Sequence, residues 1–185
     1  MPSSPYPVVF RSVLGWVWLG LAAAVSVFLV ADMAARATAW DAFLVAPWLA
    51  GVVWLVWIFQ TAPRIVADTR GVRFHNVLRI VDVPWSAVRS LRLRYSVELT
   101  LRSGGTVTAW GGASRRMHRS LKRQDVDPAE LQVESLEQLH AQAEGEPADV
   151  RRGWDWPAVA AGAVILVWIA FSLGVTGGFV VPGAA

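Results

Sequence analysis

Arginines dominate the residues in this chain whose chemistry could serve a function, and they concentrate in its middle. Between Arg64 and Arg123 the sequence holds 13 basic and 3 acidic side chains, whereas residues 125–149 hold 8 acidic and no basic ones. Near a bilayer each Lys or Arg contributes about 1 kcal/mol of attraction to anionic lipid. The basic region is therefore a candidate surface for anionic headgroups or for a partner protein.

The candidate face combines a strand with the segment that follows it. Its strand members alternate with apolar residues and so share the outward side. The candidate residues are Arg92, Arg94, Arg102, Arg115, Arg116, Arg119, Lys122 and Arg123. The alternative is a solvated face partly paired with the acidic segment, and residues 114–124 fit either a loop or a short basic amphipathic helix. Nucleic acid is disfavoured as a partner, because the neighbouring acidic segment would repel phosphate.

Motifs typical of catalysis, metal binding or cofactor binding do not occur in the sequence. The chain has no cysteine, and His75, His118 and His140 lack the spacing of a metal site. There is no Gly-x-Ser-x-Gly, phosphate loop or His-Glu-x-x-His motif. We therefore expect a protein that is not an enzyme, with no catalytic residues, no metal site and no cofactor.

Three uncharged segments must position the basic region: residues 12–31, 42–59 and 158–176. The chain is 55% hydrophobic, its mean hydropathy is +0.42, and it contains 11 tryptophans, which favour membrane interfaces. At 1.5 Å per residue, about 20 helical residues cross a hydrocarbon core of about 30 Å. We expect a transmembrane hairpin in residues 1–62, a central domain in 63–149, and a third span with a short tail in 150–185.

The first span has an alternative interpretation as a signal peptide, with Ala37-Thr38-Ala39 as its cleavage site. The span is longer than the usual apolar region of about 7–15 residues, which favours a retained helix. Lys and Arg placement then sets the orientation, because basic residues stay on the cytoplasmic side. One basic residue lies in 32–41 and fifteen lie between Arg64 and Arg152. We expect a multi-pass protein of the cell membrane with a cytoplasmic central domain and an outside C-terminus.

The central domain shows strand periodicity. Short strands are expected from residue 65 to 83, and apolar residues alternate strictly from Leu91 to Leu101, with a hairpin near residues 95–96. The Gly-Gly turn at 104–105 predicts a return strand over 106–110. Trp85 and Val88 are the expected core anchors. Asp127, Pro128 and Glu130 form a helix start, so a closing helix should cover the sheet.

Several of these motifs resemble a known family. The Gly-Val-Arg-Phe step at 71–74, the Val-Pro-Trp-Ser-Ala-Val step at 83–88, the Gly-Gly hairpin and the closing helix resemble bacterial PH-like domains. The chain is most similar to the actinobacterial membrane type that includes low-molecular-weight protein antigen 6, over about residues 1–143. This resemblance implies an α+β membrane protein, with a transmembrane hairpin before a PH-like antiparallel β-barrel or sheet that is capped by a helix. The third span departs from that pattern.

The expected function is non-catalytic binding near the membrane, either of a protein partner or of anionic lipid headgroups. The alternative is an accessory subunit that associates with a larger membrane complex through its helices.

Overall fold

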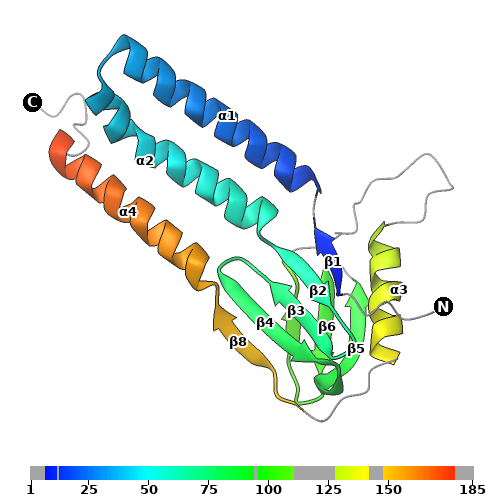
Figure 1. Cartoon of the computed structure of the whole chain (residues 1–185). Coiled ribbons are helices and arrows are strands. Elements are labelled where there is room, and N and C mark those ends of the chain that lie inside the picture. The colour runs from blue at the N-terminus through cyan, green and yellow to red at the C-terminus, as the bar shows by residue number, and fades with distance from the viewer. Residues whose placement is uncertain (1–6, 12, 94–95, 111–127, 142–147, 178–185) are drawn as a thin grey trace, which may run out of the picture.

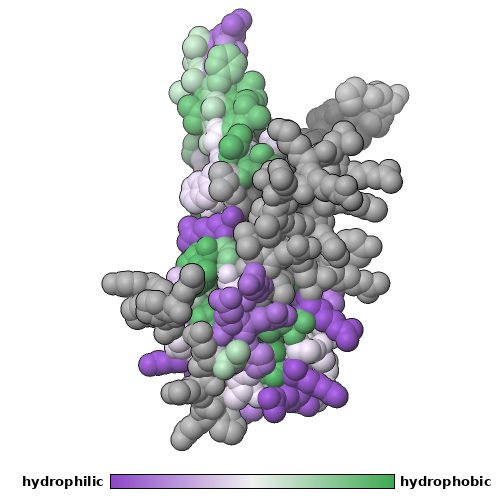
Figure 2. Space-filling view, turned by 90° about the vertical axis from the view of Figure 1, so that its right-hand side faces the viewer, coloured by the Kyte–Doolittle hydropathy of each residue, from purple (hydrophilic) through white to green (hydrophobic). Residues whose placement is uncertain are grey.

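The computed structural model describes residues 7–11, 13–93, 96–110, 128–141 and 148–177. Three helices project side by side from one end of a β-sheet domain (Figure 1). They are α1 (Val13–Arg36), α2 (Ala39–Val56) and α4 (Trp156–Thr176). A π-helical turn, η1 (Trp57–Thr61), extends α2. Each of the three is long and apolar enough to cross a membrane. Hydrophobic residues cover much of the helical end on the side that faces the viewer in Figure 2.

The connection between the first two helices is shorter than the polar segment 32–41 suggests. Arg36 forms an ion pair with Asp32 one turn earlier, at 2.6 Å, and this pairing lets α1 continue to Arg36. Thr38 then caps α2 by accepting a hydrogen bond from the backbone N–H of Asp41 at 3.1 Å. Only Ala37 and Thr38 therefore separate α1 from α2.

Helix α2 lies between α1 and α4 and packs against both (Figure 1). Polar groups hold α4 to α2 near each end of the contact. The indole Nε1 of Trp54 donates to the carbonyl oxygen of Ala158 at 3.2 Å. The hydroxyl of Ser172 donates to the backbone carbonyl oxygen of Leu44 at 2.6 Å. Between apolar helices, packing and such hydrogen bonds supply the association energy.

Sheet A has five antiparallel strands in the order β1-β2-β3-β4-β8. They are β1 (Val8–Arg11), β2 (Arg64–Ala67), β3 (Gly71–His75), β4 (Arg79–Pro84) and β8 (Arg151–Trp154). Its inner side carries the buried Ile65, Val72, Phe74 and Val83.

Two strands of this sheet lie outside the segment 63–149 that the sequence delimits as the central domain. Strand β1 immediately precedes α1, and β8 runs directly into α4. A strand of four residues shows too little alternation to be recognised, and β1 pairs with β2 across the whole helical hairpin. The described sheet thus joins three separate parts of the chain, and it fixes the near ends of all three helices at one side.

Sheet B contains β5 (Val88–Leu93), β6 (Val97–Leu101) and β7 (Thr106–Thr108). The predicted hairpin between Leu91 and Leu101 is confirmed, because Leu91 pairs antiparallel with Leu99. The Gly104-Gly105 turn is also confirmed, since both glycines have positive φ angles of 88° and 91°. The return strand is shorter than predicted and ends at Thr108.

The core lies between the two sheets, with Trp85 and Val88 buried as predicted. A short 3-10 turn, η2 (Trp85–Ala87), joins the sheets, and the Trp85 indole donates to the carbonyl oxygen of Asp68 at 2.7 Å. Helix α3 (Pro128–Ala141) covers one side of the domain, inserting Leu136 into the core. The expected cap at Asp127 lies outside the described residues. The fold is thus the predicted α+β arrangement of a helical hairpin, a helix-capped pair of sheets and a third apolar helix.

Candidate functional site

The predicted basic face is only partly described, and its described members do not form a cluster. Arg92 lies opposite Glu98 near the membrane end of sheet B, whereas Arg102 lies beyond Leu101 at the other end. The Nε of Arg102 donates to the carbonyl oxygen of Val88 at 3.2 Å. Arg94, Arg115, Arg116, Arg119, Lys122 and Arg123 lie outside the described residues.

The structure brings together a different set of residues, two arginines and a histidine, which no sequence pattern marks as a site. Arg11 at the end of β1 pairs with Arg64 at the start of β2, and Arg64 pairs with His75 at the end of β3. Directly paired residues of an antiparallel sheet share one side, with Cβ atoms about 5 Å apart. We call Arg11, Arg64 and His75 the membrane-end row, because it crosses the outer side of sheet A at its junction with the helices.

Neither arginine of the membrane-end row has an ion pair with a carboxylate among the described residues. The two ion pairs found there are Arg36–Asp32, and Arg73–Asp82 one row deeper in sheet A. The pKa of His75 is lowered, first by partial burial and then by the positive charges of Arg64 and Arg73, while Asp155 and Asp82 partly oppose this. Two arginine charges, Arg64 in the row and Arg73 beside it, thus act on His75 in addition to burial.

Exposed aromatic side chains surround the junction between sheets and helices. Trp110, beyond β7, packs on Phe59 of η1 with ring centroids 6.3 Å apart, and both rings are exposed. At the start of β4, the guanidinium of Arg79 lies 4.8 Å from the ring centroid of Trp154. Exposed tryptophans at this level, with Trp154 leading into α4, are typical of a protein in contact with the headgroup region.

A cleft of about 730 Å³ opens between the two sheets on the side away from α3. Its rim includes the edge strands β7 and β8, and its lining includes Val81, Val107 and Trp110 together with Arg79 and Arg152. Arg152 pairs with the core residue Val81 and so lies on the inner side of sheet A. No ion pair of Arg79 or Arg152 occurs within the described part of the chain.

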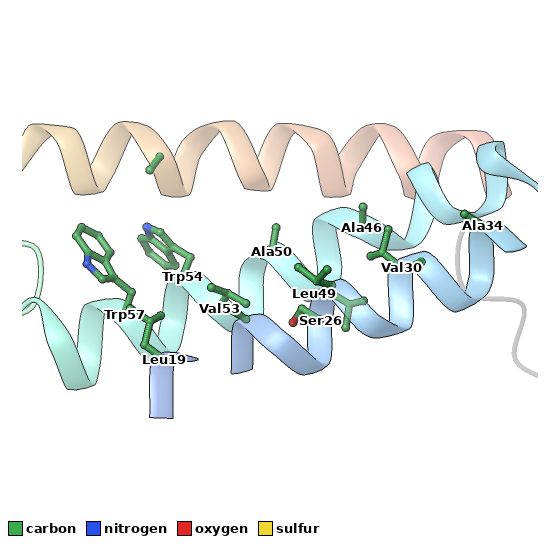
Figure 3. Close-up of a pocket in the computed structure, with 14 residues that line it drawn as sticks. Leu19, Ser26, Val30, Ala34, Ala46, Leu49, Ala50, Val53, Trp54 and Trp57 are labelled. Carbon is green, nitrogen blue, oxygen red and sulfur yellow. The ribbon is translucent and has the colours of Figure 1, made fainter. Parts of the chain in front are cut away.

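An apolar groove of about 770 Å³ runs along α1 and α2 (Figure 3). Ala161 of α4 also lines it. Small side chains such as Ala34, Ala46 and Ala50 line much of it, and Ser26 supplies a hydroxyl (Figure 3). Small residues allow another helix or an acyl chain to approach the backbone closely. The groove has the chemistry of a lipid-exposed or helix-packing surface and contains no ionisable group.

Clusters of three or more His, Asp or Glu residues able to hold a metal ion do not occur in the described ranges. The titratable side chains that the structure does bring together are mostly arginines, which stay protonated near neutral pH. The geometry therefore suits binding of an anion better than proton transfer.

Comparison with known proteins agrees with this architecture. Residues 62–142 match the family described as "Bacterial PH domain". No curated protein and no solved structure matches the chain. The matched segment begins just before β2 and ends just after α3, so it covers both sheets except for β1 and β8. The chain is therefore a membrane protein that carries a bacterial PH domain between its second and third apolar helices.

Proposed function

We propose that this protein is a non-catalytic membrane protein that holds its PH domain against the cytoplasmic face of the cell membrane and binds anionic lipid headgroups there. One observation carries the proposal: sheet A continues without a linker into all three apolar helices, through β1, η1–β2 and β8. The domain is thereby held at a fixed distance from the bilayer. Its basic residues then act at high local concentration on headgroups.

The cytoplasmic orientation is supported by the basic residues next to the helices. Since the chain has no cysteine, single introduced cysteines can report topology. We expect Ala37→Cys, in the α1–α2 connection, to be labelled from outside intact cells by a membrane-impermeant maleimide. We expect Thr100→Cys, on sheet B, to be labelled only after the cells are opened. The reverse pattern would contradict this orientation.

Headgroup binding is tested with the full chain in nanodiscs of phosphatidylcholine or of phosphatidylcholine mixed with phosphatidylglycerol. We expect native mass spectrometry to find phosphatidylglycerol retained on the released protein in preference to phosphatidylcholine. Salt should reduce this preference, because exposed charges are screened over about 8–10 Å at physiological ionic strength. Equal retention of both lipids would refute the proposed lipid binding.

Binding of a protein partner is a second candidate, which the cleft between β7 and β8 favours. Edge strands offer unpaired backbone groups to an added strand, and Arg79 and Arg152 would suit an acidic segment. A photo-crosslinking residue in place of Thr108, on β7, should then capture one defined polypeptide in native membranes. The same residue in place of Arg89, on β5, serves as the control, and capture of lipid alone at Thr108 would exclude this candidate.

The remaining alternative, an accessory subunit of a larger membrane complex, is favoured by the small side chains in the groove between α1 and α2. Replacing Ala50 by Leu fills the groove without changing charge, and it should release such a partner while leaving the lipid preference intact. Retention of the same membrane complex by Ala50→Leu would argue against association through this groove.

A further inference from the structure

The membrane-end row places like charges directly opposite one another, which is unusual in a sheet. Arg11 and Arg64 are register partners on neighbouring strands, and His75 is the next residue in the same row. Like charges at opposed cross-strand positions destabilise a sheet. In the next row on the same side the positive charge is balanced, because Arg73 there faces Asp82 and forms an ion pair with it.

Within the described residues, no carboxylate forms an ion pair with either arginine of the membrane-end row. Asp155 is close enough to raise the pKa of His75, but it lies toward the β8 side of the row. Its carboxylate also accepts the backbone N–H of Ala158 at 3.4 Å, as the cap of α4. Arg11 is exposed and Arg64 half-buried, so both guanidinium groups are available to an external anion.

The row also lies at the depth of the headgroups. Arg11 comes three residues before Leu14, where the first span begins, and Arg64 comes three residues after Thr61, where the second ends. Both arginines are therefore within three residues of the apolar segments. An anion held between them would lie at the level of the lipid phosphates.

We infer that Arg11, Arg64 and His75 bind the phosphate group of an anionic phospholipid headgroup. Guanidinium groups recognise phosphate oxygens with paired, charge-assisted hydrogen bonds, and two of them on adjacent strands can hold one phosphate from both sides. A phosphate that carries no covalently attached cation, as in phosphatidylglycerol, places one negative charge between the two guanidinium groups and so offsets part of their repulsion. This inference rests on the proposed lipid binding and assigns its site to sheet A rather than to the outer side of sheet B.

The test uses the full chain with the double substitution Arg11→Gln and Arg64→Gln. The charge-matched control is Arg92→Gln with Arg102→Gln, which removes two arginines from sheet B. We expect the first pair to weaken phosphatidylglycerol binding about 25-fold, from about fivefold per arginine, and the control pair to change it less than about threefold. The readout is the amount of phosphatidylglycerol retained in native mass spectrometry across a titration.

A second readout separates binding from folding. In phosphatidylcholine nanodiscs the Arg11→Gln and Arg64→Gln protein should unfold at the same or a higher temperature than the unsubstituted protein, because the like-charge contact is gone. Added phosphatidylglycerol should raise the unfolding temperature of the unsubstituted protein only. Lys at both positions keeps the charge and should restore a large part of the lipid preference. If the Gln pair fails to fold, the Lys pair and its salt dependence provide the same comparison.

The outcomes are distinct. Loss of preference in the sheet B control, with the Arg11 and Arg64 variant unaffected, would overturn the assigned site and leave the proposed function standing. Equal binding of both lipids by the unsubstituted protein would overturn the function itself. Inorganic phosphate is the remaining arm: if it stabilises the detergent-solubilised chain as strongly as phosphatidylglycerol does, through the same arginines, the ligand is a soluble phosphate and the lipid assignment is wrong.

Discussion

The hydroxyl of Thr61 donates a hydrogen bond to the backbone carbonyl oxygen of Gly15 at 3.1 Å, in a buried position. This bond joins the π-helical end of the second span to the first turns of α1. A π-helical turn shifts the following residues relative to a regular helix, and such turns often occur at functional positions. Here it directs the chain into β2 while holding α1 against η1.

Substitution of Gly15 should separate these two segments. A Cβ atom at Gly15 would lie 2.1 Å from the carbonyl oxygen of Gln60, a backbone atom that cannot move alone. We expect Gly15→Ala to destabilise the protein by about 1–3 kcal/mol, as overpacking does. The measurement is thermal unfolding of the purified chain in detergent. Gly20→Ala is the matched control, since a Cβ there meets nothing within 4 Å, and an equal loss in both variants would contradict the contact.

The contact between α2 and α4 can be tested in the same way. A Cβ at Gly162 would lie 2.5 Å from the Trp54 ring, and that ring is held by its hydrogen bond to Ala158. Gly162→Ala should therefore break the hydrogen bond or move α4 away, and lower the unfolding temperature. Gly174→Ala, on the same helix with open space around it, should have no such effect. Tryptophan fluorescence is the readout, because the environment of Trp54 changes with the contact.

Trp85 is expected to be the most sensitive residue of the PH domain core. It is 1% exposed, and its indole donates to the carbonyl oxygen of Asp68 at 2.7 Å. Trp85→Ala should cost about 3–5 kcal/mol through cavity formation. Trp85→Phe should cost about 1–3 kcal/mol, because it leaves the carbonyl of Asp68 without its donor. Trp156→Phe, at an exposed position, is the control for loss of an indole, and chemical unfolding of the full chain in detergent provides the values.

We predict that the folded protein loses stability in mild acid because of His75. Burial and the charges of Arg64 and Arg73 lower its pKa in the folded protein, against the pull of Asp155 and Asp82. The unfolded chain therefore binds the proton more readily below about pH 6.5, and folding stability falls as pH drops through that value toward the folded pKa. Unfolding temperatures in phosphatidylcholine nanodiscs, compared between about pH 7.5 and about pH 5.5, should show the decrease.

The matched variant for this prediction is His75→Gln, which should lose the His75 part of the pH dependence and keep the rest. Arg64→Gln removes one of the two charges that lower the pKa, so its pH dependence should be weaker than that of the unsubstituted protein. An unchanged profile in His75→Gln would show that another group is responsible.

A large part of the PH domain could be predicted from local pattern. The alternation from Leu91 to Leu101, the Gly-Gly turn and the Trp85 step each report on neighbours within a few residues, and each is found in the structure. The three apolar helices could be predicted equally well, because about twenty consecutive apolar residues rarely occur outside a membrane-spanning helix. The largest underestimate of length is at the end of α1, where Asp32 and Arg36 pair inside the helix, whereas α2 with η1 and α4 extend the predicted spans by only two or three residues at an end.

The membrane-end row could not be predicted, because its members are adjacent only through strand pairing. Arg11 and Arg64 stand on opposite sides of the helical hairpin in the sequence, and no local pattern places them together. The available signal was a basic residue directly before one span and directly after the next, and by itself that signal indicates only orientation. The two described members of the predicted basic face, Arg92 and Arg102, lie at opposite ends of sheet B, since alternation assigns residues to a side but not to a position along it. The face as a whole stays a prediction.

The insertion of the helical hairpin between β1 and β2 also sets the order in which the molecule can be made. Strand β1 is synthesised before either of the first two spans, yet its partner β2 emerges only after both. Strand β1 therefore has no partner strand until the whole helical hairpin has been synthesised. A chain whose second span fails to return leaves β2 with a bare edge, the kind of surface that promotes aggregation and is open to quality-control proteases. Completion of sheet A thus requires that the hairpin between β1 and β2 brings both strands to the same side.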